Sequence, residues 1–105
     1  MRHLRPFELK AYLENAGQPL LLDVREPWEF KICHLAGSRL VPMRKIPQEI
    51  ETLEPSQETV LICHHGIRSR QVGYFLENAG FTYLINLTGG VEAWAKEVDP
   101  NMPTY

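Results

Sequence analysis

The chain has 105 residues, which is enough for one domain with a single core. Its 11 basic and 13 acidic residues give a formal net charge of −2, which argues against a broad cationic surface for nucleic acid or for an anionic membrane. Two cysteines are too few for a disulfide framework, and no apolar stretch approaches the roughly 20 residues of a membrane helix. Residues 1–6 lead into an amphipathic segment rather than a signal peptide, so we expect a cytoplasmic protein with reduced cysteines.

Helical and strand patterns alternate in the first half of the chain. Apolar residues at helical spacing predict a helix from Pro6 to Leu13, which stops before residues 17–19. The continuous apolar run over residues 20–24 predicts a strand that is covered on both faces. A brief helix over residues 26–32, a short strand over residues 40–42 and a helix over residues 47–53 follow.

The second half repeats this alternation. Residues 59–63 are expected to form the central strand, followed by a helix over residues 68–78 and a strand over residues 83–87. The inward face of that helix is predicted to carry Val72, Phe75, Leu76 and Ala79. Gly89-Gly90 turns the chain into a last helix over residues 91–98, ahead of a tail over residues 99–105. The pattern predicts one α/β domain over residues 1–105, with a mainly parallel sheet of four to five strands flanked by helices on both faces.

Cys63 ends the predicted central strand and starts a loop of the form CxxxxR, which closes at Arg68. In such a strand-loop-helix turn the backbone N–H groups converge on one point, and Gly66 allows the tight curvature. Helix N-termini and neighbouring cations favour the thiolate form of a cysteine, so Cys63 is a candidate nucleophile. Asp23 lies at the end of another strand and is expected at the same edge of the sheet. A loop of this size suits one sulfur atom or a modest anion around the thiolate, whereas a phosphoryl group on the cysteine needs one more residue.

Four motifs occur in a fixed order along about residues 6–94. They are Leu21–Glu26 followed by Glu29, His34–Ser38, Cys63–Ser69 and Gly89–Trp94. Together they resemble a single-domain rhodanese. The resemblance implies a sulfurtransferase in which Cys63 takes sulfane sulfur from a donor and carries it as a persulfide. It also implies that the active-site loop that binds the substrate consists of His64, His65, Gly66, Ile67, Arg68 and Ser69.

The reaction that the resemblance implies moves sulfur from thiosulfate or a persulfide to cyanide or a thiol, and it needs no cofactor. A protein persulfide donor and a thioredoxin-like acceptor are further candidate partners. The alternative function is a sulfur carrier or interaction module that a partner protein loads. A phosphatase or arsenate-reductase site is opposed by the loop length, because the loops of those relatives are one residue longer. A catalytically silent copy is opposed by the presence of Cys63.

Several supporting residues leave two interpretations open. Arg68 either holds the loop or meets the negative charge of the sulfur donor, and we expect it to bridge the loop and the body of the domain. Asp23 and Arg25 either serve the site or tie the strand end to neighbouring loops. Ser69 either caps the helix or hydrogen-bonds the loop. Cys33 either closes the brief helix as a small side chain or supplies a second thiol.

The adjacent histidines depart from the family pattern, because an arginine or lysine often follows the cysteine. Histidine is only partly charged near neutral pH, so the cationic rim of the loop is weakened and selectivity for thiosulfate is put in question. The side chains of His64 and His65 are expected to point apart, and the sequence places no third ligand beside them. We therefore predict no metal site.

Overall fold

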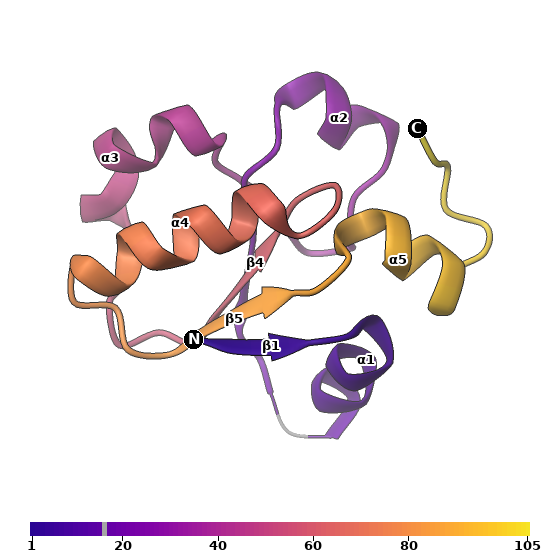
Figure 1. Ribbon diagram of the computed structural model, residues 1–105, viewed down its shortest axis with the longest axis horizontal. Helices are drawn as coiled ribbons and strands as arrows, with labels where there is room; N and C mark the ends of the chain where they lie inside the picture. The colour runs from indigo at the N-terminus through magenta and orange to yellow at the C-terminus, as the bar shows by residue number, and fades with distance from the viewer. Residues whose placement is uncertain (16) are drawn as a thin grey trace.

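A five-stranded sheet with the strand order β1-β5-β4-β2-β3 forms the centre of the fold, and its neighbouring strands pair in parallel (Figure 1). The computed structural model describes residues 1–15 and 17–105. In chain order the elements are β1 (Arg2–Leu4), α1 (Pro6–Asn15), β2 (Leu20–Asp23), α2 (Pro27–Ile32), β3 (Arg39–Leu40), α3 (Ile46–Glu49), β4 (Thr59–Ile62), α4 (Ile67–Asn78), β5 (Leu84–Leu87) and α5 (Gly90–Glu97). The predicted α/β fold with a small parallel sheet is confirmed.

The central strand is β4, which pairs with β2 on one side and with β5 on the other. All four of its residues are buried, as expected for a strand of a parallel sheet covered on both faces. Successive side chains along β4 and the residue after it alternate between two hydrophobic clusters: Val60 and Ile62 belong to one, and Leu61 and Cys63 to the other. The strand therefore carries Cys63 to the carboxyl edge of the sheet.

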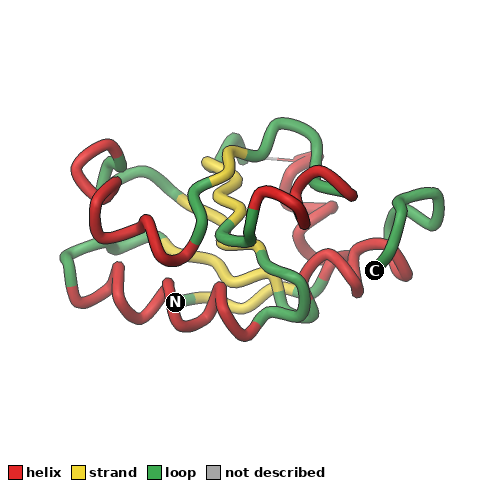
Figure 2. Tube along the Cα trace, turned by 90° about the horizontal axis from the view of Figure 1, so that it is seen from above, coloured by secondary structure: helices red, strands yellow, loops and turns green. Residues whose placement is uncertain are grey.

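Helices cover both faces of this sheet. Val72 and Leu76 of α4 pack with Ile46 of α3 in the cluster that contains Leu61 and Cys63. Residues of α1 and α5 pack in the cluster on the opposite face. Figure 2 shows the strands between these helical layers. The sheet is thus flanked on both faces, as predicted.

The inward face of α4 differs from the prediction at two positions. Val72 and Leu76 are buried as expected, but Phe75 is 44% exposed and Ala79 is exposed. The buried positions of the helix are Ser69, Val72, Gly73 and Leu76. These positions follow the i, i+3, i+4, i+7 spacing of one helix face, and Phe75 lies about 100° around the axis from Leu76. The prediction selected apolar residues, whereas the face includes a serine and a glycine.

Short elements account for the remaining differences. The edge strand β1 was not predicted, because only Leu4 of its three residues is buried and three residues carry no readable period. The helix expected over residues 47–53 is divided into α3 and a 3₁₀ turn, Ile50–Thr52, and another 3₁₀ turn, Met43–Lys45, precedes it. Helix α2 begins at Pro27, where the missing N–H of proline costs no hydrogen bond.

The tail after α5 folds back onto the body of the domain. In Figure 1 the C-terminal segment, drawn in yellow, leaves α5 and returns toward α2. Met102 and Tyr105 pack against the cluster formed with α1 and α5. Among the described residues, no helix has both the length and the apolar character needed to cross a lipid bilayer.

Candidate active site

The loop between β4 and α4 wraps around the sulfur atom of Cys63. The N–H of Gly66 donates a hydrogen bond to Cys63 Sγ at 3.0 Å. Gly66 has φ +94° and immediately precedes α4, so the left-handed turn expected of glycine directs this amide inward. A Cβ atom at Gly66 would also lie 3.0 Å from the backbone nitrogen of Gly89. The thiol is 1% exposed and lies at the start of a 12-residue helix, whose N-terminal dipole favours an anion.

A buried serine and asparagine form a hydrogen-bonded relay to the same sulfur. Ser69 Oγ lies 3.2 Å from Cys63 Sγ and donates its hydroxyl proton to Asn86 Oδ1 at 2.6 Å. With that proton given to Asn86, the Cys63 S–H is the donor across the 3.2 Å contact. When the thiol ionises, the same hydroxyl can turn and donate to the thiolate, which charge-assisted hydrogen bonding favours. The structure therefore places Ser69 in the second of its two predicted roles.

Asn86 was not singled out from the sequence. It lies in β5 between Ile85 and Leu87, and it is 3% exposed. Besides accepting the Ser69 proton, its amide donates to the carbonyl of Gly66 at 3.3 Å. A polar residue within a fully buried strand is the signal that would have identified it, because a buried amide needs partners.

Arg68 joins the end of the loop to α2. Its guanidinium forms two parallel hydrogen bonds to the Glu29 carboxylate, each 2.8 Å long. Only 5% of the Glu29 side chain is exposed. These hydrogen bonds lower the pKa of Glu29 from its ordinary 4.5 to about 2, against the opposing effect of burial. The carboxylate is therefore ionised at neutral pH and holds Arg68 against the body of the domain.

Asp23 and Arg25 form a buried pair next to this contact. Arg25 Nη2 lies 2.7 Å from Asp23 Oδ2, and both residues are 0% exposed. The same nitrogen donates to the carbonyl of Cys33 at 2.6 Å, so the pair ties the end of β2 to the end of α2. The contacts of Cys63 Sγ, in contrast, are with Gly66 and Ser69. Asp23 and Arg25 thus make no hydrogen bond to the sulfur among the described residues, and Cys33 is buried at the end of α2.

Tyr105, in the C-terminal tail, connects these two ion pairs. Its hydroxyl donates to Glu29 Oε1 at 2.8 Å and accepts from Arg25 Nη1 at 2.9 Å. Burial raises the pKa of Tyr105 to about 12, and Glu29 adds to the rise while Arg25 opposes it. The phenol therefore stays protonated and can donate to the carboxylate throughout the neutral range.

The two histidines of the loop lie together, so the prediction that their side chains point apart is wrong. The imidazoles of His64 and His65 stack with centroids 3.9 Å apart, and His64 also stacks on the ring of Tyr105 at 3.9 Å. Burial, with the charge of His65, lowers the pKa of His64 below its usual value. Glu92 of α5 brings a carboxylate to the pair, and the ligand atoms of the three residues all lie within 4.8 Å of one another.

The start of α5 explains the predicted Gly89-Gly90 motif. The N–H groups of Val91 and Glu92 donate to the carbonyls of Cys63 and His64 at 2.9 and 3.2 Å. A Cβ atom at Gly90 would overlap both of these carbonyl oxygens. The close approach of the helix to the loop therefore requires glycine at this position. Of the remaining loop residues, Ile67 is 57% exposed and starts α4 on the solvent side.

Comparisons with known proteins agree with this geometry. The family model described as the rhodanese-like domain matches residues 6–97. The chain is 32% identical to thiosulfate sulfurtransferase GlpE of Stutzerimonas stutzeri, over 85% of this chain and 81% of that protein. A crystal structure of a rhodanese-like domain protein from Staphylococcus aureus has a TM-score of 0.85 at 27% identity, and covers 100% of this chain and 99% of that chain.

Longer proteins also contain a region similar to this chain. It is 40% identical over 89 residues to the rhodanese-like/PpiC domain-containing protein 12, chloroplastic, of Arabidopsis thaliana, over 81% of this chain and 30% of that protein. It is 35% identical to the probable adenylyltransferase/sulfurtransferase MoeZ of Mycobacterium tuberculosis, over 97% of this chain and 26% of that protein. The chain thus spans less than a third of the length of these two relatives.

Proposed function

The chain belongs to the rhodanese-like domain family, and on that premise we propose that it is a sulfurtransferase that carries sulfane sulfur as a persulfide on Cys63. The observation that carries this proposal is the pair of groups at the sulfur: the Gly66 amide donates to it at 3.0 Å, and the Ser69 hydroxyl, 3.2 Å away, can turn to donate once the thiol ionises. Both stabilise a negative charge on sulfur, which is the state that attacks a donor and that later leaves as the acceptor takes the sulfur.

The reaction has two halves. The Cys63 thiolate attacks the outer sulfur of thiosulfate or of a persulfide, a new S–S bond forms, and the donor's S–S bond breaks. Sulfite or a thiolate leaves with the bonding electron pair. In the second half, cyanide or an acceptor thiolate attacks the outer sulfur, and the Cys63 thiolate departs as the leaving group. This is covalent, ping-pong catalysis, and every electron pair is accounted for without a cofactor.

We infer further that a thiol persulfide, on a small molecule or on a partner protein, loads Cys63 better than thiosulfate does. Thiosulfate is a dianion, and two guanidinium groups around the site are already paired, Arg68 with Glu29 and Arg25 with Asp23. The carboxylate of Glu92 adds negative charge beside His65 at the rim. A persulfide carries less charge and meets less repulsion there. The sulfur-carrier alternative, loaded by a partner protein, rests on the same observation.

The test is the intact-protein mass after brief exposure to thiosulfate or to a low-molecular-weight persulfide, followed by a chase with cyanide. We expect one added sulfur atom that disappears in the chase, with faster loading from the persulfide. Cys63→Ser should prevent loading, and Cys33→Ser, the matched variant of the other buried thiol, should still load. Loading of Cys63→Ser, or no loading from either donor, would contradict the proposal. Faster loading from thiosulfate would contradict only the inferred donor preference.

A further inference from the structure

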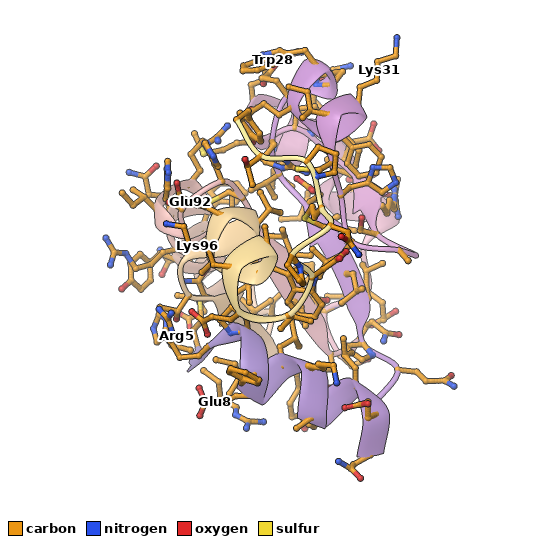
Figure 3. All side chains as sticks on the ribbon, turned by 90° about the vertical axis from the view of Figure 1, so that its right-hand side faces the viewer. Arg5, Glu8, Trp28, Lys31, Glu92 and Lys96 are labelled. Atoms are coloured by element: carbon orange, nitrogen blue, oxygen red, sulfur yellow. The ribbon has the colours of Figure 1, made fainter. Side chains whose placement is uncertain are left out.

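Three metal-binding side chains converge at the rim of the thiol loop. The ligand atoms of His64, His65 and Glu92 all lie within 4.8 Å of one another, and His65 Nε2 is 3.2 Å from Glu92 Oε2. The side chains of His65 and Glu92 are 52% and 40% exposed, and His64 is partly buried. Figure 3 shows Glu92 on the outer side of α5, where solvent reaches it. An ion from solution therefore has direct access to the cluster.

The backbone holds these residues close together, so their proximity does not depend on side-chain flexibility alone. The N–H of Glu92 donates to the carbonyl of His64 at 3.2 Å, and the N–H of Val91 donates to the carbonyl of Cys63 at 2.9 Å. The His64 ring is further restrained by its stack on Tyr105, which is tilted by only 13°. The backbones of His64 and Glu92 are thus fixed relative to one another, and the His64 ring is restrained, before any ion binds.

The donor set selects a class of metal. Two imidazoles and one carboxylate are the protein ligands of many zinc sites that keep a fourth position open, and imidazole suits zinc, copper and nickel. Calcium and magnesium prefer oxygen ligands. Donor atoms around one tetrahedral zinc lie roughly 3.4 Å apart. No two ligand atoms of the cluster lie more than 4.8 Å apart, so the side chains have to close only slightly. Because the two imidazoles are stacked, one of them has to turn out of the stack to face the ion, and the more exposed His65 can do so while His64 keeps its stack on Tyr105.

The charge around the cluster is mixed. Lys96 lies one helical turn after Glu92 on α5, and both side chains project from the same side of the helix in Figure 3. Lys96 competes for the carboxylate and repels a cation, but it is exposed, and water screens its charge. Arg68 pairs with Glu29 and so does not compete for the carboxylate of Glu92. The negative charge of the Glu92 carboxylate is therefore the main electrostatic attraction for a cation at this site.

We propose that His64, His65 and Glu92 form a binding site for a divalent transition metal of the zinc class at the mouth of the thiol loop. This site does not depend on the sulfur-transfer reaction, because none of its three ligands is the nucleophile. Its occupation would restrain His64, the residue that follows Cys63. The proposal and the proposed function can therefore fail independently.

The test uses the full chain with Cys63→Ser, so that the active-site thiol cannot act as a ligand. Co²⁺ is titrated by its visible absorption and Zn²⁺ by competition with bound Co²⁺. We expect one ion per chain, and we expect Glu92→Gln and His65→Gln each to weaken binding by about tenfold or more. Glu97→Gln on the same helix and His34→Gln, another exposed histidine, are the matched controls and should bind normally.

A second measurement avoids substitution of the ligands. In the Cys63→Ser chain, the imidazole nitrogen signals of His64 and His65 should shift on addition of Zn²⁺, while those of His3 and His34 should stay unchanged. The proposal is wrong if neither metal binds saturably. It is equally wrong if Glu92→Gln and His65→Gln bind as tightly as the controls, or if the signals of His3 or His34 respond instead.

Discussion

Glu29→Gln tests the contact that holds the active-site loop to the body of the domain. The Glu29 carboxylate accepts both hydrogen bonds of Arg68 and the hydroxyl of Tyr105. It also accepts the backbone N–H of Glu26 as part of the capping box of α2. Glutamine keeps the volume of the side chain but removes the charge, and it turns an NH₂ group toward donors that need an acceptor. The Arg68 guanidinium then has no counterion at the buried position of Glu29.

The pKa of Glu29 sets the expected magnitude. A pKa lowered from an ordinary 4.5 to about 2 corresponds to at most about 3 kcal/mol of folding free energy. Since 33% of the Arg68 side chain is exposed, we discount this to about 2 kcal/mol for solvent screening. Urea unfolding of Glu29→Gln at pH 7 should show a free energy of unfolding lower by about 2 kcal/mol.

The pH dependence follows from the direction of the same shift. Because the folded protein lowers the pKa of Glu29, the unfolded chain binds this proton at higher pH than the folded chain does. The stabilisation is complete above the ordinary pKa and is lost as the pH falls from about 5 to about 2. Glu29→Gln lacks this component, so its free energy of unfolding should fall less over that range than that of the unsubstituted chain.

Glu51→Gln, at an exposed glutamate, is the control and should lie within about 0.5 kcal/mol of the unsubstituted protein. If Glu29→Gln is as stable as this control at pH 7, the ion pair with Arg68 contributes no net stability. If it shows the full acid-induced loss, another group is responsible for that loss. Either result would refute the reasoning.

Three further substitutions test other contacts of the loop. Gly90→Ala places a Cβ against the carbonyls of Cys63 and His64 and should lower the free energy of unfolding by about 3 kcal/mol or more. The control Gly37→Ala is also at positive φ but has open space around it, so it should cost only about 1 kcal/mol. Equal losses in thermal unfolding would contradict the packing argument. Ser69→Ala removes the hydroxyl beside Cys63 Sγ and leaves Asn86 Oδ1 without its donor, so the free energy of unfolding should fall by about 1–2 kcal/mol. The alkylation of Cys63 at neutral pH should also become slower. An unchanged alkylation rate would exclude a role for the relay in stabilising the thiolate. Tyr105→Phe keeps the stack on His64 but removes the hydroxyl between Arg25 and Glu29. Urea unfolding should show a free energy of unfolding lower by about 1–2 kcal/mol. An unchanged value would mean that the hydroxyl of Tyr105 contributes nothing and that only its ring holds the tail.

Local patterns in the sequence were sufficient to predict the central part of the fold. The apolar runs of β2 and β4 form strands, β4 fully buried and β2 buried at its end, and the loop after β4 brings a cysteine and an inward-facing glycine amide together as expected. These predictions depend on neighbouring residues only, because the period of apolar residues and the conformational freedom of glycine are local properties. Strand β1 has no such period, since its place in the sheet comes from its pairing with β5.

Contacts across long stretches of the chain were harder to predict. Asn86 is 17 positions from Ser69 in the sequence, yet the neighbouring strands β4 and β5 bring its amide beside the loop. The register between those strands decides which residue of β5 faces Ser69, and within β5 only the polar character of Asn86 indicates that position. Glu92 reaches the histidines for a similar reason, because the backbone bonds at the start of α5 set its position.

The tail shows why a segment without periodicity can still belong to the site. Residues 99–105 contain two prolines and no helical or strand pattern, so local rules assign them only to a loop. Their position is set at the far end, where the Tyr105 hydroxyl finds an acceptor in Glu29 and a donor in Arg25. Asp23 holds the Arg25 guanidinium and Arg68 holds the Glu29 carboxylate where the Tyr105 hydroxyl meets both. The Tyr105 hydroxyl therefore has both of its partners only where these ion pairs are formed, and weakening Glu29 should release the hydroxyl and, through the stack of Tyr105 on His64, loosen the rim of the thiol loop.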